Sequence, residues 1–371
     1  MTSLEGEGAV ADDLLYVNVE LPLQAYTIEI GTAILDQLGA VVARLDGVRH
    51  AIIITDKNVQ SLHAETVTNS LQHAGIRIDM LVVEPGEASK SIDVAGQLWN
   101  DMLAIGADRT SMVVAVGGGV VGDLAGFVAA SYARGIRLVQ VPTTLLAQVD
   151  SSVGGKVGIN LPTAKNMVGA FWQPEYVICD TETLCSLPDR EFSAGLAEVV
   201  KYGVILDEAF FAELEEIADA IWSRDGAALR RIVSRCCELK AGVVGQDERE
   251  TSGLRVVLNY GHTFCHAIES LTGYDRFLHG EAVSIGMLCA SRLAASMGRI
   301  DDAMTERQRQ LLARFLLPVE MPPLDPEQMI EAMLHDKKVK HGQLRFVLPD
   351  RMGHVELVEG VDLELVRQCC Q

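Results

Sequence analysis

Three histidines and one glutamate have the residue types and spacing of a metal site. His262 and His266 are four residues apart in the segment NYGHTFCH, so they lie on one face of a predicted helix. His279 opens the segment HGE, and Glu198 lies within GLAEVVK on another predicted helix. One carboxylate and two imidazoles that leave a coordination position open are typical of catalytic zinc. The spacing leaves undecided which of His262 and His266 binds metal; the other imidazole would be available for proton transfer.

A glycine-rich segment, GGGVVGD at 117–123, follows a predicted strand and opens a predicted helix. Glycines at such a place let backbone N–H groups approach a pyrophosphate. The motif departs from the dinucleotide fingerprint, because it does not follow the first strand and no acidic residue ends the next strand. A tight turn explains it equally well when it is taken alone. The segments at 85–87 (PGE) and 141–144 (VPTT) follow two other predicted strands, and the three strand ends together favour nucleotide binding.

Basic residues recur in segments that are otherwise apolar or small. Lys156 follows the small-residue turn DSSVGG, which would expose backbone to a ligand. Further candidates are Lys165, Lys201, Lys240, Arg255 and the pair Lys337–Lys338. Arginine suits bidentate recognition of a carboxylate and lysine acts as a point charge on phosphate, so the set fits a substrate that carries both groups. Each could instead be a surface charge, and for Lys337–Lys338 that alternative is the stronger.

The elements that must position these residues fall into two parts. Short apolar runs alternate with amphipathic segments before residue 188, which predicts a parallel sheet covered by helices. Expected strands are Ala51–Thr55, Ile76–Val83, Met112–Val116, Leu138–Val141 and Tyr176–Cys179, with Tyr26–Ile30 as an edge strand; expected helices are Val59–Ala74 and Ser91–Ile105. Beyond residue 188, helices are expected at Arg190–Leu206, Glu208–Ile221, Ala227–Val244, His262–Leu271, Gly280–Met297 and Thr305–Leu316. A short strand or hairpin is expected at Gly342–Leu348. The prediction is an α/β nucleotide-binding domain over 1–188 and an all-helical domain over 189–371, with the chemistry in the cleft between them.

Composition narrows the classes of protein. The 371 residues hold 51 acidic and 31 basic side chains, a net charge of −20, which argues against binding nucleic acid or an anionic membrane. A basic pocket for a small anionic substrate stays compatible with that charge. No run of twenty apolar residues and no secretory signal is visible, and the eight cysteines form no CxxC pair. A reduced cytoplasmic protein is expected.

Several long segments together resemble the 3-dehydroquinate synthase family. The resemblance runs from about Lys57 to Val339 and rests on GGGVVGDLAGFVAASYARG, PTTLLAQVDSSVGGKVGIN, KNMVGAFWQP, LPDREFSAGLAEVVKYG, CCELKAGVVGQDERET and NYGHTFCHAIE. It implies an NAD-binding α/β domain, a helical metal-binding domain and a homodimer. One departure is Cys265, where the family more often has glycine; slight crowding of the helix without loss of function is expected.

The resemblance also implies site residues. Zinc or cobalt would be held by Glu198, His262 and His279, which leaves His266 as the free imidazole. NAD would contact Asp56, Asn58, Glu84, Glu87, Lys90, Gly118, Gly119, Asp123, Thr143, Thr144, Lys156, Lys165, Thr183 and Ser186. The sugar-phosphate substrate would meet Asp150, Lys156, Lys165, Asn166, Lys201, Lys240, Glu250, Arg255, Asn259 and Lys338. Catalytic roles would fall to His266, Lys165, Lys156, Lys201 and Asn166.

The implied reaction converts 3-deoxy-D-arabino-heptulosonate 7-phosphate to 3-dehydroquinate and phosphate in the shikimate pathway. It would proceed by transient oxidation with NAD, β-elimination of phosphate, re-reduction and an intramolecular aldol closure. Three alternatives share parts of the pattern: a related sugar-phosphate cyclase, a glycerol-dehydrogenase-like oxidoreductase with net NADH formation, and a non-catalytic NAD-binding regulator. Arg255, Asn259 and the Lys165–Asn166 pair favour the substrate that carries a carboxylate.

Overall fold

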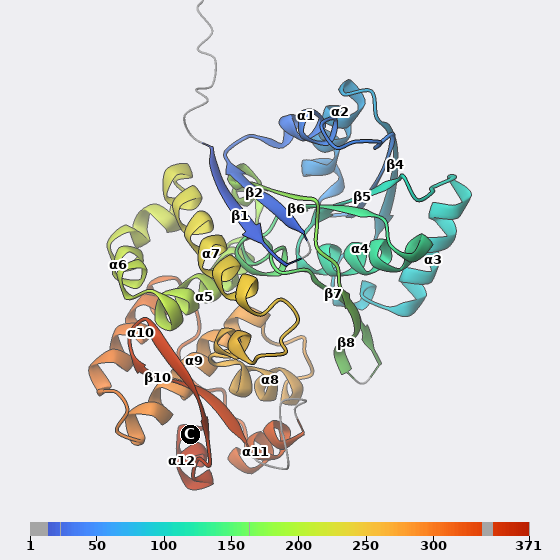
Figure 1. The fold of residues 1–371 in the computed structure, drawn as a ribbon. Coiled ribbons are helices and arrows are strands. Elements are labelled where there is room, and N and C mark those ends of the chain that lie inside the picture. Colours follow the sequence, from blue (N-terminus) through green and yellow to red (C-terminus); the bar gives the residue numbers. More distant parts are fainter. Residues whose placement is uncertain (1–13, 23, 163, 336–343, 371) are drawn as a thin grey trace, which may run out of the picture.

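A seven-stranded sheet forms the first part of the molecule (Figure 1). The structure is a computed structural model that describes residues 14–22, 24–162, 164–335 and 344–370. Along the sheet the strand order is β1-β2-β9-β6-β5-β3-β4. The strands are β1 (Leu15–Glu20), β2 (Ala25–Gly31), β3 (His50–Asp56), β4 (Arg77–Val83), β5 (Met112–Gly117), β6 (Arg137–Pro142) and β9 (Tyr176–Asp180).

Five of the six predicted strands correspond to β3, β4, β5, β6 and β9, which pair in parallel, and β4 lies at one edge of the sheet. The prediction of Tyr26–Ile30 as an edge strand is wrong in position, because β1 pairs antiparallel with β2 and takes the edge. Only Val17 and Val19 of β1 are buried, and so short an alternation is easily overlooked in a sequence.

Helices cover both faces of the sheet, as an all-parallel core requires. The helices are α1 (Leu38–Val42), α2 (Glu65–His73), α3 (Ile92–Ala104) and α4 (Gly119–Ser131), and a π-helical turn at Gln60–Ala64 precedes α2. Ile53 of β3 packs in the cluster under α1 and α2. Its neighbours Ile52 and Ile54 pack in the cluster under α3 and α4. This alternation explains why β3 reads as a continuous apolar run.

The second part is helical, as predicted. It contains α5 (Asp189–Leu206), α6 (Glu208–Trp222), α7 (Gly226–Gln246), α8 (His262–Leu271), α9 (His279–Ser296), α10 (Asp302–Arg314), α11 (Pro326–Leu334) and α12 (Leu363–Cys369). The predicted late strand lies in a hairpin of β10 (Arg345–Arg351) and β11 (His354–Glu359), so this part is not all-helical. Helices α11 and α12 were not predicted.

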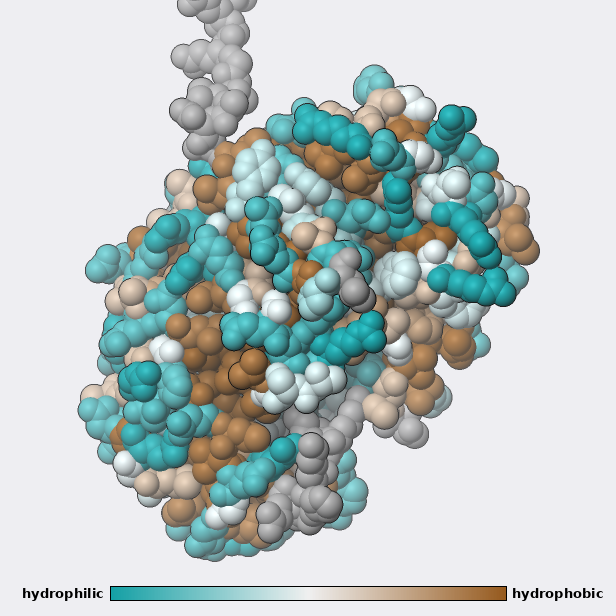
Figure 2. Space-filling view, in the orientation of Figure 1, coloured by the Kyte–Doolittle hydropathy of each residue, from teal (hydrophilic) through white to brown (hydrophobic). Residues whose placement is uncertain are grey.

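The two parts share a hydrophobic core. One cluster joins Val17, Val19 and Ile28 of the sheet edge to residues of α5 and α7 such as Leu196 and Ile232. A second hairpin, β7 (Lys156–Leu161) with β8 (Ala164–Phe171), was not predicted; it extends from the sheet domain toward α8 in Figure 1. Hydrophilic side chains are spread over the face drawn in Figure 2, with apolar patches mainly over the helical part. No helix in the described ranges is long and apolar enough to cross a membrane.

Candidate active site

The carboxyl ends of the parallel strands bring the predicted nucleotide-binding residues to one edge of the sheet. Asp56 ends β3, where its Oδ1 accepts hydrogen bonds from the backbone N–H groups of Asn58 and Val59 at 2.8 and 3.0 Å. Thr143 follows β6, and its N–H donates to the carbonyl of Gly117 at the end of β5 (2.9 Å). In open α/β sheets this edge is where ligands bind.

The glycine loop packs closely against neighbouring side chains at the start of α4. Gly118 is the N-cap of α4 and offers no side chain to the free N–H groups of the first turn. A Cβ on Gly118 would lie 3.0 Å from Cγ2 of Thr144, and one on Gly119 would lie 3.1 Å from Oγ of Ser151. Close packing therefore accounts for glycine at both positions, and binding of a dinucleotide phosphate at the α4 N-terminus stays a prediction.

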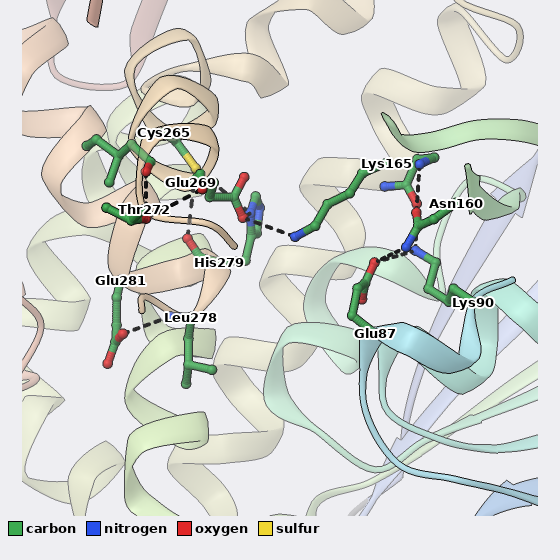
Figure 3. Close-up of polar contacts among 12 residues, drawn as sticks. Glu87, Lys90, Asn160, Lys165, Cys265, Glu269, Thr272, Leu278, His279 and Glu281 are labelled. Carbon is green, nitrogen blue, oxygen red and sulfur yellow. Dashed lines mark hydrogen bonds and ion pairs between the residues drawn. The ribbon is translucent and has the colours of Figure 1, made fainter. Parts of the chain in front are cut away.

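A buried lysine ties together three of the predicted residues beside this loop. Lys90 is 4% exposed; its Nζ donates to Oδ2 of Asp123 at 2.8 Å and to Oδ1 of Asn166 at 2.6 Å, and lies 3.4 Å from Glu87 (Figure 3 shows its surroundings). Burial alone would lower the pKa of Lys90, but Asp123 and Glu87 outweigh it and raise the pKa. Lys90 therefore stays positively charged beside Asp123, the last residue of the glycine-rich segment 117–123.

Further predicted nucleotide contacts follow the ends of β9 and β4, two strands that are not neighbours in the sheet. Thr183 and Ser186 line a cleft of ≈ 600 Å³ that also involves Asp180 and His63. Nε2 of His63 lies 2.8 Å from Oγ of Ser186. At the end of β4, Glu84 forms an ion pair with Lys57. These residues are near the strand ends that the sequence predicted, and their contact with NAD stays a prediction.

The three predicted metal ligands converge from three helices. Glu198 lies within α5, while His262 and His279 begin α8 and α9, and their donor atoms lie within 4.8 Å of one another. Oε1 of Glu198 is 3.7 Å from Nε2 of His262 and 3.8 Å from Nε2 of His279. Zinc bonds of about 2.0–2.2 Å place tetrahedral ligands roughly 3.4 Å apart, so small side-chain movements would seat the ion. The donor set and its spacing fit a divalent metal.

The structure places His266 beside this cluster. Its ring centroid is 5.7 Å from that of His262 in an edge-on arrangement. The spacing argument left open which imidazole binds metal, and the geometry groups His262, not His266, with Glu198 and His279.

A chain of buried charges extends from the metal cluster. Lys201, 2% exposed, pairs with Oε2 of Glu198. Nζ of Lys240 donates to Oδ1 of Asp150 at 2.7 Å, and the hydroxyl of Tyr202 donates to the same oxygen at 2.8 Å. Burial alone would raise the pKa of Asp150, but Lys240 and Lys201 outweigh it and hold the pKa well below its usual range. For Lys201, the loss of hydration is outweighed by Glu198 and Asp150, and its pKa is raised.

A second basic group lies at the start of the β7–β8 hairpin. Lys156 forms an ion pair with Glu250, whose Oε1 is also 3.7 Å from Nε of Arg255. Arg255 is 2% exposed, and its Nε is buried without a hydrogen-bond partner. Asn259 ends the 3-10 helix Leu254–Asn259 that leads into the metal-binding segment. Lys337 and Lys338 lie outside the described residues.

Sequence reasoning missed three residues of this region. Tyr202 and Glu269 are buried in contact with predicted site residues, and buried Gln148 donates to the carbonyls of Pro142 and Asp180 at two strand ends. For Tyr202 and Glu269 the sequence holds one signal, which is a position one helical turn from a predicted site residue. Tyr202 is four residues after Glu198, and Glu269 is three residues after His266.

Comparison with solved structures shows that the fold is that of the sugar-phosphate cyclases. A 2-deoxy-scyllo-inosose synthase in complex with carbaglucose-6-phosphate, NAD⁺ and Co²⁺ has a TM-score of 0.87 and is 27% identical, covering 96% of this chain and 99% of the other. The 2-epi-5-epi-valiolone synthase of Streptomyces hygroscopicus with NAD⁺ and Zn²⁺ has a TM-score of 0.85 at 27% identity, covering 94% and 97%. A glycerol dehydrogenase of Schizosaccharomyces pombe, at 18% identity and a TM-score of 0.67 over 92% and 86%, shares the fold alone.

Sequence comparison identifies the family within that class. Models of the 3-dehydroquinate synthase N-terminal and C-terminal regions match residues 80–194 and 195–339. A 3-dehydroquinate synthase of Rhodopirellula baltica is 56% identical over 85% of this chain and 84% of its own length. One of Desulforamulus reducens is 48% identical over 93% and 96%. The chain belongs to the 3-dehydroquinate synthase family.

Proposed function

We propose that this protein converts 3-deoxy-D-arabino-heptulosonate 7-phosphate to 3-dehydroquinate and phosphate, as a carbon–oxygen lyase that depends on NAD and a divalent metal. The observation that carries the proposal is the convergence of Glu198, His262 and His279 next to a set of buried and half-buried cations. Family membership and the cofactors named for the related cyclases support it.

The residues described above would hold both cofactors. Zinc or cobalt bound by Glu198, His262 and His279 would acidify a substrate hydroxyl, and NAD bound at the strand ends and the α4 N-terminus would accept and return a hydride. Lys90 keeps its charge beside Asp123 and can balance the pyrophosphate.

The chain's own cations would bind and orient the substrate. Lys201 is kept protonated by Glu198 and Asp150, so it acts as a fixed point charge on phosphate. Arg255, whose Nε makes no hydrogen bond although it lies 3.7 Å from Glu250, would offer its guanidinium to a carboxylate. The β-elimination requires a proton to leave the carbon next to the ketone; with the substrate's phosphate as base, Lys156 and Lys201 would restrain that phosphate. His266 and Lys165 would transfer protons during ring opening and aldol closure.

A phosphate-release assay tests the function. Purified protein with NAD, zinc and the heptulosonate phosphate is expected to release one phosphate per 3-dehydroquinate without net NADH, and a strong chelator should stop the reaction until metal is restored. Accumulation of NADH in step with product would instead indicate an oxidoreductase. Turnover of sedoheptulose 7-phosphate, with none of the heptulosonate, would indicate a cyclase for substrates without the carboxylate.

Gly118→Ala is expected to weaken NAD binding about tenfold, or about 1.4 kcal/mol, because a methyl group 3.0 Å from Cγ2 of Thr144 would displace the backbone at the α4 N-terminus where the pyrophosphate would bind. Isothermal titration with NAD measures the effect. Gly96→Ala on α3 is the matched control, since a Cβ there meets nothing within 4 Å. Equal NAD affinity of the two variants would contradict the assignment of the glycine loop.

We also propose a cytoplasmic homodimer with a domain boundary at residue 188. The free state of all eight cysteines, seven of them buried, supports a reducing compartment. The start of α5 at Asp189 supports the boundary. The family resemblance supports the dimer, and sedimentation equilibrium would test it.

A further inference from the structure

Glu269 is a buried carboxylate for which the reaction outlined above has no role. It lies on α8, one turn beyond His266, and is 6% exposed. Figure 3 shows its carboxylate beside the His279 ring and a dashed line to Lys165. Oε1 of Glu269 is 3.3 Å from Nδ1 of His279 and 3.8 Å from Nζ of Lys165. One carboxylate oxygen therefore faces both a proposed metal ligand and a proposed catalytic lysine.

The two nitrogens of His279 face different partners. Nε2 lies toward Glu198, at 3.8 Å, and Nδ1 lies toward Glu269. A carboxylate that accepts a hydrogen bond from Nδ1–H leaves the lone pair on Nε2, where a metal would be bound. Sγ of Cys265 is also near Nδ1, at 3.9 Å, but a thiol is a weaker acceptor than a carboxylate.

The second partner of Glu269 comes from the other part of the molecule. Lys165 is the second residue of β8 in the hairpin β7–β8, and its Nζ also lies 4.4 Å from the centre of the Tyr274 ring. The pair Lys165–Glu269 thus joins the hairpin of the α/β part to the helix that begins with His262.

We propose that Glu269 is a positioning residue that fixes His279 in its metal-binding tautomer and, through the same carboxylate, places Lys165 at the substrate site. The inference rests on the proposed function, since it presupposes a metal at His279. In this role Glu269 does not contact the substrate. Loss of its charge should weaken metal binding and at the same time change the contribution of Lys165.

Metal affinity is the first readout. Zn²⁺ dissociation constants measured by competition with a chromophoric chelator are expected to rise about 10–100-fold for Glu269→Ala, the range found when the partner of a metal-bound histidine is removed. Glu269→Gln should show a smaller rise, because its amide oxygen still accepts from Nδ1–H. Glu215→Gln is the matched control: Glu215 lies on α6, which carries none of the proposed metal ligands, and pairs with Arg307 at 2.6 Å. Its zinc affinity should stay close to wild type.

Wild-type zinc affinity in both Glu269 variants would overturn the inference. If Glu269→Ala does not fold, as judged by circular dichroism of the metal-free protein, Glu269→Gln alone decides. A wild-type protein that retains no zinc would instead refute the proposed function, so the two failures are distinguishable.

A double-mutant cycle is the second readout. Lys165→Met and Glu269→Gln are combined, and kcat and KM are measured with zinc at saturation for every variant. The proposal expects non-additive losses, since each single change removes the same pair. Losses in kcat/KM that multiply independently would overturn the placement of Lys165 by Glu269.

Discussion

Replacing His279 by alanine is expected to abolish metal retention and to lower the rate of phosphate release on the order of 10³-fold, because a metal acting as a Lewis acid contributes several kcal/mol. The physical reason is the geometry of the site. With His279 removed, only Glu198 and His262 remain of the cluster. Two ligands cannot define the open tetrahedral site that three define. Metal content after gel filtration and phosphate release under saturating NAD are the two measurements.

His73→Ala serves as the control for His279→Ala. His73 is an exposed histidine at the end of α2, on the outside of the sheet domain. It should keep wild-type metal content and activity. A His279→Ala protein that still copurifies with one equivalent of metal and releases phosphate at the wild-type rate would rule out the metal assignment.

Asp150→Asn is expected to destabilise the folded protein by about 2–3 kcal/mol, somewhat less than the 3–5 kcal/mol typical of breaking a fully buried ion pair. The expected loss of stability is smaller because 30% of the Asp150 side chain is exposed to solvent. Lys240 and Lys201, which are 6% and 2% exposed, would lose the carboxylate that balances their charges, and burial already lowers the pKa of Lys240. Urea unfolding at pH 7, with the exposed substitution Asp302→Asn as control, measures the difference.

The same variant should show the pH dependence of this ion pair. Because Lys240 and Lys201 hold the pKa of Asp150 below its unfolded value, the carboxylate stabilises the native state above that unfolded value, about 3.9. This contribution falls as the pH drops through the lowered pKa. The stability gap between wild type and Asp150→Asn is therefore widest above about pH 4 and narrows in more acidic solution. A gap that widens with acid would show that the pKa of Asp150 is raised.

Most of the fold could be predicted from the sequence, for reasons visible in single elements. β5 is buried at every residue and reads as a continuous apolar run, and Ser91 caps α3 by accepting from the N–H of Val94. The hairpin β7–β8 could not be predicted in this way, because most of β8 is exposed or half-buried and so shows no apolar period. The edge strand β1 has only two buried residues.

For the site, the sequence identified residue types but not their partners. The i, i+4 spacing of His262 and His266 is a local property, whereas the choice between them depends on Glu198, which is 64 residues away in sequence. Glu269 was overlooked for the same reason. Its partners Lys165 and His279 come from a hairpin and a helix whose approach to α8 only the folded chain determines.

The core shared by the sheet edge and α7 has a consequence for biosynthesis. Val17 and Val19 of β1 pack with residues of α7, and Nη1 of Arg230 donates to Oγ1 of Thr32 at 2.7 Å across 198 positions of the chain. At the usual rate of about 5–20 residues per second, a ribosome needs roughly 10–40 s to synthesise that interval. During this time the apolar face of the first strand lacks the part of its native cover that α7 supplies. The packing of this sheet edge is thus expected to be completed only after α7 has been synthesised.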